Sequence, residues 1–145
     1  MNRFGGAASR NFDNLFQSYA RAFARFDAAA VAEHWAFPAF FCARGKRASL
    51  DQEGFRANVE AVIAFYHRQG ATEVEAELVR VEPLFEGLDL VAVQYRLAKA
   101  AGEEIAAWEH LYLASETEEG LRLVAAFADG ELDAWEARGT PLGDW

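Results

Sequence analysis

Residues 73–98 read EVEAELVRVEPLFEGLDLVAVQYRLA, and this stretch decides the fold because polar and apolar side chains alternate along it. The glutamates at 73, 75 and 77 alternate with apolar residues, which is the period of a strand with one face in solvent. The apolar positions change phase at Leu78–Val79, which predicts a bulge. After a turn at 86–89, Leu90–Ala98 again carries apolar side chains on one face. The stretch therefore predicts two long antiparallel strands.

Two more strands are expected on the C-terminal side of this pair, at 105–115 and 121–128, with the acidic turn 116–120 between them. On its N-terminal side the pattern is helical. One apolar stripe with helical spacing consists of Phe12, Leu15, Phe16, Tyr19, Phe23 and Phe26. Asp27 is placed to cap a short second helix, and a third helix is expected to end near Gly70.

Helices followed by a strand meander indicate an α+β domain. We expect one curved antiparallel sheet wrapped around three N-terminal helices, which gives a cone-shaped domain. A sheet that wraps around helices leaves a conical cavity, which suits a small apolar ligand. The predicted boundaries are a flexible leader at 1–10, the domain at 11–129 and a C-terminal tail at 130–145 that lies over the surface.

Composition narrows the range of partners. The chain has 145 residues, 14 basic and 23 acidic, and its net charge of −9 argues against a nucleic-acid partner. Cys42 is the single cysteine, so no disulfide forms within the chain and a reducing, cytoplasmic location is expected. The longest apolar run is Trp35–Ala43, which is too short to span a membrane as a helix.

Three features of the sequence resemble the nuclear transport factor 2-like superfamily, which includes ketosteroid isomerases and polyketide cyclases of the SnoaL type. These are the segment Leu15–Tyr19 followed by Asp27, the proline-containing first strand with a long helix after it, and the strand Trp108–Leu113 followed by Leu121–Phe127. The resemblance covers about residues 11–129 and implies the cone-shaped fold, a cystatin-like roll. It does not imply one activity, because this fold hosts many unrelated functions.

By this resemblance, Tyr19 matches a tyrosine that donates a hydrogen bond to an oxyanion in the ketosteroid isomerases, and Glu109 matches their second, protonated donor. Alternation along its strand also predicts that Glu109 points to the buried side, where burial raises a carboxyl pKa. The alternative is a structural acid paired with Arg96, Arg47 or a backbone group. The position of the family's catalytic base falls at Cys42–Ala43, where this chain has no acid, so His34 is the remaining candidate base.

Two further groups of residues are predicted. The cavity is expected to be lined by Phe16, Phe23, Trp35, Phe40, Cys42, Tyr66 and Leu111. Trp108, His110 and Tyr112 are expected on the outer face of their strand, where large amphipathic side chains favour a homodimer interface. The alternative is that the C-terminal tail, with Trp135 and Trp145, folds back over that face.

The first functional hypothesis is a protein that binds a small apolar, carbonyl-like molecule, oriented by Tyr19 and Glu109. The second is an isomerase, cyclase or dehydratase that works by acid–base catalysis, and the third is a module that only dimerises. No cofactor is expected, and no metal, because the histidines at 34, 67 and 110 lack the close spacing of a zinc site.

Overall fold

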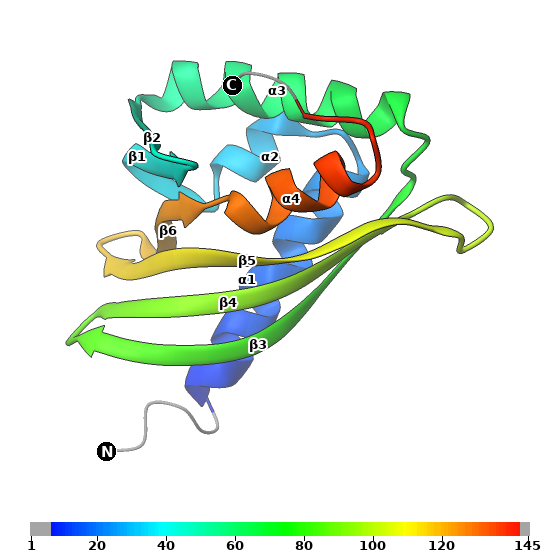
Figure 1. Ribbon diagram of the computed structural model, residues 1–145. Coiled ribbons are helices and arrows are strands. Elements are labelled where there is room, and N and C mark those ends of the chain that lie inside the picture. The colour runs from blue at the N-terminus through cyan, green and yellow to red at the C-terminus, as the bar shows by residue number, and fades with distance from the viewer. Residues whose placement is uncertain (1–6, 143–145) are drawn as a thin grey trace.

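The computed structural model describes residues 7–142 and consists of a six-stranded sheet with four helices (Figure 1). Residues 1–6 and 143–145, which include most of the predicted leader and Trp145, lie outside the described part. In chain order the elements are α1 Ala7–Ala24, α2 Ala28–Ala32, β1 Trp35–Ala43, β2 Lys46–Leu50, α3 Gln52–Arg68, β3 Glu73–Phe85, β4 Leu88–Ala98, β5 Glu104–Thr117, β6 Gly120–Phe127 and α4 Asp129–Ala137.

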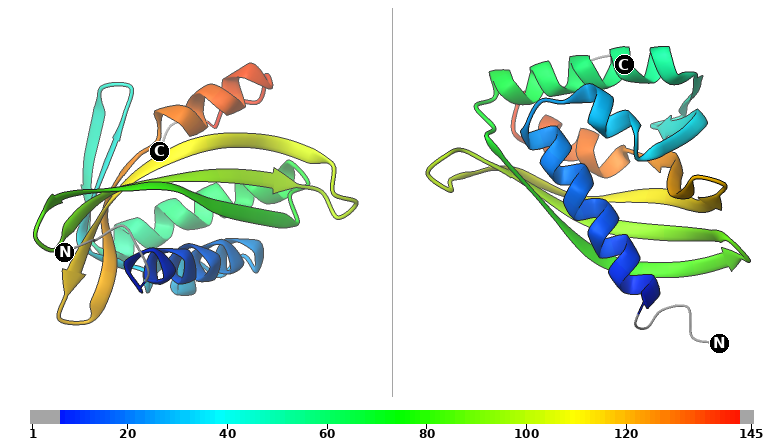
Figure 2. Two further views of the ribbon diagram at one scale, coloured as in Figure 1. Left: turned by 90° about the horizontal axis from the view of Figure 1, so that it is seen from below. Right: turned by 180° about the vertical axis from the view of Figure 1, so that it is seen from behind.

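The strands are ordered β2-β1-β6-β5-β4-β3, with β1 parallel to β6 and every other neighbouring pair antiparallel. The sheet is strongly bent, and α1 and α3 lie on its concave side (Figure 2). The α+β prediction is therefore confirmed. The predicted bulge is also present, because the register of β3 against β4 shifts between Leu78 and Arg80.

The helices follow from local chemistry with one change of boundary. Asp27 caps α2 as expected, since its Oδ1 accepts a hydrogen bond from the Ala30 amide at 3.0 Å. Helix α1 begins at Ala7, so the prediction that residues 7–10 belong to a leader is wrong. The apolar stripe of α1 packs against the sheet, with Phe12, Phe16 and Tyr19 buried.

The predicted surface tail is also corrected, because residues 129–137 form α4. Strand β6 pairs with β5 only from Leu111 onward, so the first half of β5 has no strand on that edge. Helix α4 packs along this free edge (Figure 1). Arg138, just after the helix, donates to the Ile105 carbonyl of β5 at 3.0 Å. An uncovered strand edge invites pairing with another chain, and α4 protects this one.

The two faces of β5 are the reverse of those predicted. Trp108, His110 and Tyr112 point to the concave side and are buried, whereas Glu109 is exposed on the convex side. Alternation could not decide between the faces because both carry apolar residues. The aromatic set lies inside because Trp108 packs against aromatic rings of α3 and α4, and Tyr112 packs against one of α1, whereas Glu109 is exposed.

No helix among residues 7–142 has the length and apolar character needed to cross a membrane. In the same residues, no cluster of three or more His, Cys, Asp or Glu side chains is arranged to hold a metal ion.

Candidate functional site

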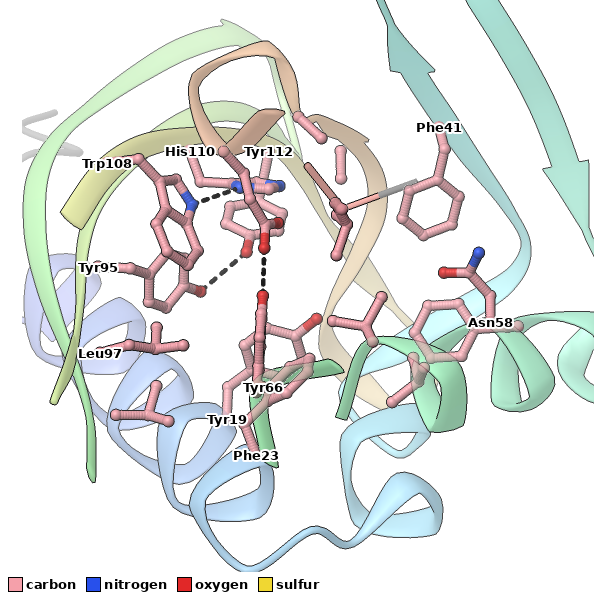
Figure 3. A pocket seen from close by; sticks show the side chains of 18 of the residues that line it. Tyr19, Phe23, Phe41, Asn58, Tyr66, Tyr95, Leu97, Trp108, His110 and Tyr112 are labelled. Carbon is pink, nitrogen blue, oxygen red and sulfur yellow. Dashed lines mark hydrogen bonds between the residues drawn. The ribbon is translucent and has the colours of Figure 1, made fainter. Parts of the chain in front are cut away.

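A cavity of about 90 Å³ lies between the concave face of the sheet, α1, α3 and α4 (Figure 3). A water molecule needs about 10–15 Å³ of such space, so the cavity has room for on the order of six to nine groups of that size. Its walls are mostly aromatic, and the described lining contains no Lys or Arg. The lining residues that carry polar groups are Tyr19, Trp35, Asn58, Tyr66, Tyr95, Trp108, His110, Tyr112 and Glu131.

Glu131 is the acidic residue of this lining, and its side chain reaches the cavity from the first turn of α4. Oε2 accepts hydrogen bonds from the Tyr66 hydroxyl and, at 3.2 Å, from Nε1 of Trp135. Trp135 lies four residues later on the same helix face and is completely buried. Both bonds are made to the same oxygen, so Oε1 has no hydrogen-bond partner among the described residues.

Burial raises the pKa of Glu131 from 4.5 to about 7, although the hydrogen bonds from Tyr66 and Trp135 act in the opposite direction. Near neutral pH the carboxyl is therefore present both with and without its proton. A group in this state can accept a proton from one atom of a ligand and return it to another.

Three tyrosine hydroxyls lie in the same cavity besides that of Tyr66. The Tyr19 hydroxyl accepts a hydrogen bond from Nε1 of Trp35 at 3.0 Å. The hydroxyls of Tyr95 and Tyr112 bond to each other at 2.8 Å, as Figure 3 shows. Burial is the main cause that raises the pKa of all three, so they stay protonated at neutral pH. Because an indole N–H only donates, the proton of Tyr19 is not used in its bond to Trp35.

His110 completes the polar lining. Its Nδ1 accepts a hydrogen bond from Nε1 of Trp108 at 3.0 Å (Figure 3), and burial lowers its pKa to about 4. The ring is neutral at pH 7.

The hydrogen-bonding capacity that remains determines which kind of molecule the cavity could accept. Within the described residues, the Tyr19 hydroxyl proton and one proton of the Tyr95–Tyr112 pair have no acceptor, and Oε1 of Glu131 has no donor. The site offers donors to an oxygen atom and one carboxyl oxygen that can take a proton. No Lys or Arg in the part of the lining that the structure describes would balance a negative charge, so an anionic molecule would be bound at a cost.

The predicted pair of Tyr19 and Glu109 does not exist. Tyr19 lies in the cavity lining, but Glu109 is on the opposite face of the sheet. There Oε1 of Glu109 accepts from the Arg80 guanidinium at 3.2 Å, and both side chains are almost half exposed. Glu109 is thus a surface acid paired with an arginine, although Arg80 takes the place of the predicted Arg96 or Arg47.

His34 is not the base either, because it is absent from the lining and both ring nitrogens are already bonded. Nδ1 lies 2.7 Å from the Ala30 carbonyl oxygen, so it carries the proton, and Nε2 accepts from the Ser18 hydroxyl at 2.9 Å. Burial lowers the pKa of His34. The residue ties α2 to α1.

The other predicted lining residues divide between the two faces. Phe23, Trp35 and Tyr66 line the cavity. Phe16 is buried in the core outside the lining. The remaining three were wrong because alternation places them on the outer face: Phe40, which is exposed, and Cys42 and Leu111, which line a shallow groove there.

The residues predicted for a dimer interface are cavity residues. Trp108, His110 and Tyr112 are each at most 7% exposed in the single chain, so they are not free to contact a second copy. The alternative in which the tail covers this face describes part of what is seen, since Trp135 packs against Trp108 with ring centroids 6.2 Å apart.

Sequence reasoning missed Glu131, although one signal was present. Glu131 and Trp135 are four residues apart, which is the spacing of neighbours on one helix face. Helical spacing in the presumed tail would have identified a helix that carries both an acid and a large apolar side chain.

Comparisons with known proteins agree with this geometry. The family model described as "NTF2-like protein (DUF6841)" matches residues 9–131. A comparison with curated proteins finds no significant match.

Several solved structures share the fold. A domain of unknown function with a cystatin-like fold from Nostoc punctiforme superposes with a TM-score of 0.67 at 18% identity, over 85% of this chain and 76% of that one. An NTF-2-like protein of unknown function from Shewanella oneidensis gives 0.63 at 12% identity, over 82% and 96% of the two chains. A ketosteroid isomerase-like protein from Erwinia carotovora atroseptica gives 0.59 at 16% identity, over 79% and 89%.

At these identities the superpositions establish the fold alone. The family model covers most of the sequence, from the start of α1 to Glu131 in α4. The chain belongs to the NTF2-like family DUF6841.

Proposed function

We propose that the protein catalyses proton transfer on a small, uncharged, largely apolar molecule that carries a carbonyl-type oxygen, as an isomerase or dehydratase does. The observation that carries this proposal is Glu131, a buried carboxyl with a pKa of about 7 and one unbonded oxygen facing an aromatic cavity. The acid that was missing from the sequence-based hypothesis is thus supplied by α4.

The chemistry needs only side chains of this chain. Ionised Glu131 would accept a proton through Oε1 from the carbon beside the carbonyl, and the electron pair of the broken C–H bond would move onto the carbonyl oxygen. The free hydroxyl protons of Tyr19 and of the Tyr95–Tyr112 pair are the donors that would stabilise this oxygen as it gains charge. Glu131 would then return the proton at another atom.

Tyr66 and Trp135 are positioning residues in this scheme. Both donate to Oε2 of Glu131, so they stabilise the ionised form and turn the other oxygen toward the ligand. Burial opposes them by favouring the protonated form, and the balance is a pKa close to neutral pH.

Binding without turnover is the second candidate. It is favoured by the size and lining of the cavity, about 90 Å³ with mostly aromatic walls, which suits retention of a small molecule. Under this alternative Glu131 would serve only as a hydrogen-bond partner.

The test uses cyclohexanone as a probe, because it is a small, uncharged, mostly apolar ketone. Exchange of the hydrogens beside its carbonyl is followed by NMR in D₂O near neutral pH. We expect the wild type to accelerate this exchange and Glu131→Gln to slow it by about 10²- to 10⁴-fold, the usual contribution of a general base.

Glu109→Gln is the matched control, since it makes the same chemical change on the convex face and should leave the rate unchanged. Equal rates for wild type and Glu131→Gln would contradict the proposal. Bound cyclohexanone without accelerated exchange would favour the binding role instead.

A further inference from the structure

Trp108 and His110 are two residues apart on β5, so both point into the cavity. Nε1 of Trp108 lies 3.0 Å from Nδ1 of His110 (Figure 3). An indole nitrogen always carries its hydrogen and can only donate, so Nδ1 must be the bare, accepting nitrogen. The proton of the neutral ring is then on Nε2.

The surroundings keep this ring neutral and fixed in orientation. His110 stacks on Tyr112 with centroids 4.8 Å apart and meets the ring of Tyr95 edge-on at 6.0 Å. The residue is 7% exposed, and no carboxyl is bonded to it among the described residues. Burial lowers its pKa to about 4, so the imidazolium is not populated at neutral pH.

The Nε2–H group has no acceptor within the described residues, although the ring lines the cavity. A buried donor usually has a partner, and one that faces a cavity is available to whatever occupies it. The site therefore has a third unused donor besides the two tyrosine protons.

We propose that Trp108 locks His110 in the Nε2–H tautomer and that this neutral N–H donates a hydrogen bond to an oxygen of the ligand. Trp108 is a positioning residue, and His110 is the residue that touches the ligand. The ligand role deepens the proposed function and rests on it, whereas the tautomer does not depend on any ligand. A neutral donor aimed at an oxygen selects an uncharged acceptor, because it supplies no positive charge that would hold an anion.

His34 provides an internal control for the tautomer. Its Nδ1 faces a backbone carbonyl oxygen, which can only accept, so His34 must carry its proton on Nδ1. The structure therefore predicts opposite tautomers for two histidines of the same chain.

The first experiment is ring ¹⁵N–¹H correlation NMR on the full ¹⁵N-labelled chain near neutral pH. We expect a protonated Nε2 for His110 and a protonated Nδ1 for His34. A protonated Nδ1 or a doubly protonated ring at His110 would overturn the proposal. Trp108→Phe removes the indole donor but keeps an aromatic ring, and it should shift His110 toward a mixture of tautomers. Unchanged His110 signals in that variant would overturn the lock.

The second experiment compares cyclohexanone with methylenecyclohexane, which has a similar shape but no carbonyl oxygen. His110→Phe should weaken cyclohexanone binding by roughly 3- to 10-fold, as expected for one lost hydrogen bond, and should leave methylenecyclohexane binding unchanged. An equal effect on both probes, or no effect on cyclohexanone, would overturn the donor role.

Failure of this inference is distinguishable from failure of the proposed function. The tautomer is read in the ligand-free protein and does not involve Glu131. If Glu131→Gln keeps full exchange activity while His110 carries its proton on Nε2, the proposed function fails and the lock stands.

Discussion

The two faces of β5 show how one strand can hold two different chemical environments. On the concave face, Trp108, His110 and Tyr112 are buried beneath helices and line a cavity. On the convex face, Glu109 and Leu111 border an open groove. The side chains alternate along the same backbone, so the difference comes from the elements that cover each face and not from the strand itself.

Glu131 and Glu109 show how the two environments affect the same functional group, a carboxyl. Glu131 is 7% exposed, bonded to two neutral donors and shifted to a pKa of about 7. The Glu109 side chain is 45% exposed and forms an ion pair with Arg80. Removal from water, rather than the presence of a carboxyl, makes Glu131 suited to proton transfer.

The largest expected contrast between the faces is in packing. Trp135→Ala removes a completely buried ring whose centroid lies 4.8 Å from that of Phe65 and whose Nε1 donates a hydrogen bond to Glu131. Urea denaturation should show a loss of about 3–5 kcal/mol in the free energy of unfolding. Phe40→Ala, on the outer face at 49% exposure, is the control and should cost far less. Similar losses for the two variants would contradict the assignment of α4 to the core.

The next contrast is in the pH dependence of stability. Because the pKa of Glu131 is raised from 4.5 to about 7, the native state holds this proton more tightly than the unfolded state. The proton on Glu131 therefore stabilises the native state fully below pH 4.5, and this contribution is lost as the pH rises through about 7. The contribution to the free energy of unfolding is about 3 kcal/mol.

His110 acts in the opposite direction, because burial lowers its pKa from 6.5 to about 4, so the wild-type curve alone does not isolate Glu131. The free energy of unfolding of the wild type minus that of Glu131→Gln, whose side chain stays neutral, should fall by this amount across that range. Glu109→Gln should follow the wild type. A Glu131→Gln profile parallel to that of the wild type would show that the carboxyl titrates normally.

A smaller loss of stability is expected for a substitution at the contact between α4 and β5. A Cβ atom added at Gly130 would lie 2.4 Å from the Glu109 carbonyl oxygen, so α4 must move away from the strand in Gly130→Ala. We expect a loss of about 1–3 kcal/mol in thermal or urea unfolding, together with slower ketone exchange because Glu131 is the next residue. Adding Glu109→Gln should give no relief, since the clash involves the backbone. Unchanged stability would mean that the helix does not pack this closely.

The smallest change in stability is expected for a substitution on the convex face. The Arg80–Glu109 pair spans 3.2 Å with both side chains almost half exposed, and Glu82 offers Arg80 a second partner at 3.7 Å. Exposed pairs contribute little, so Arg80→Gln should change the free energy of unfolding by about 0.5 kcal/mol or less. A loss as large as that of Gly130→Ala would show that this face is more than a solvated surface.

The sequence was sufficient for the architecture because its signals are periodic. Alternation in residues 73–98 and the helical stripe beginning at Phe12 each report which face an element buries. These signals identified the sheet, the three N-terminal helices and the bulge after Leu78, all of which are present.

The site was harder to predict because its key choices were not local. On β5 both faces carry apolar residues, so the period alone could not show that Trp108 faces inward and Glu109 outward. Glu131 lies in a stretch with a glycine and several acids, which resembles a surface tail until its packing against β5 is known. Burial by distant elements, not local sequence, determines these roles.

The position of α4 has a consequence for biosynthesis. Because α4 follows every strand in the chain, a ribosome releases the sheet and the first three helices before it releases Glu131. Such a nascent chain holds the aromatic walls but lacks the carboxyl, and the edge of β5 at residues 104–110 has no cover from α4. Protection against mispairing and the carboxyl of the proposed proton transfer are thus added in the same late step.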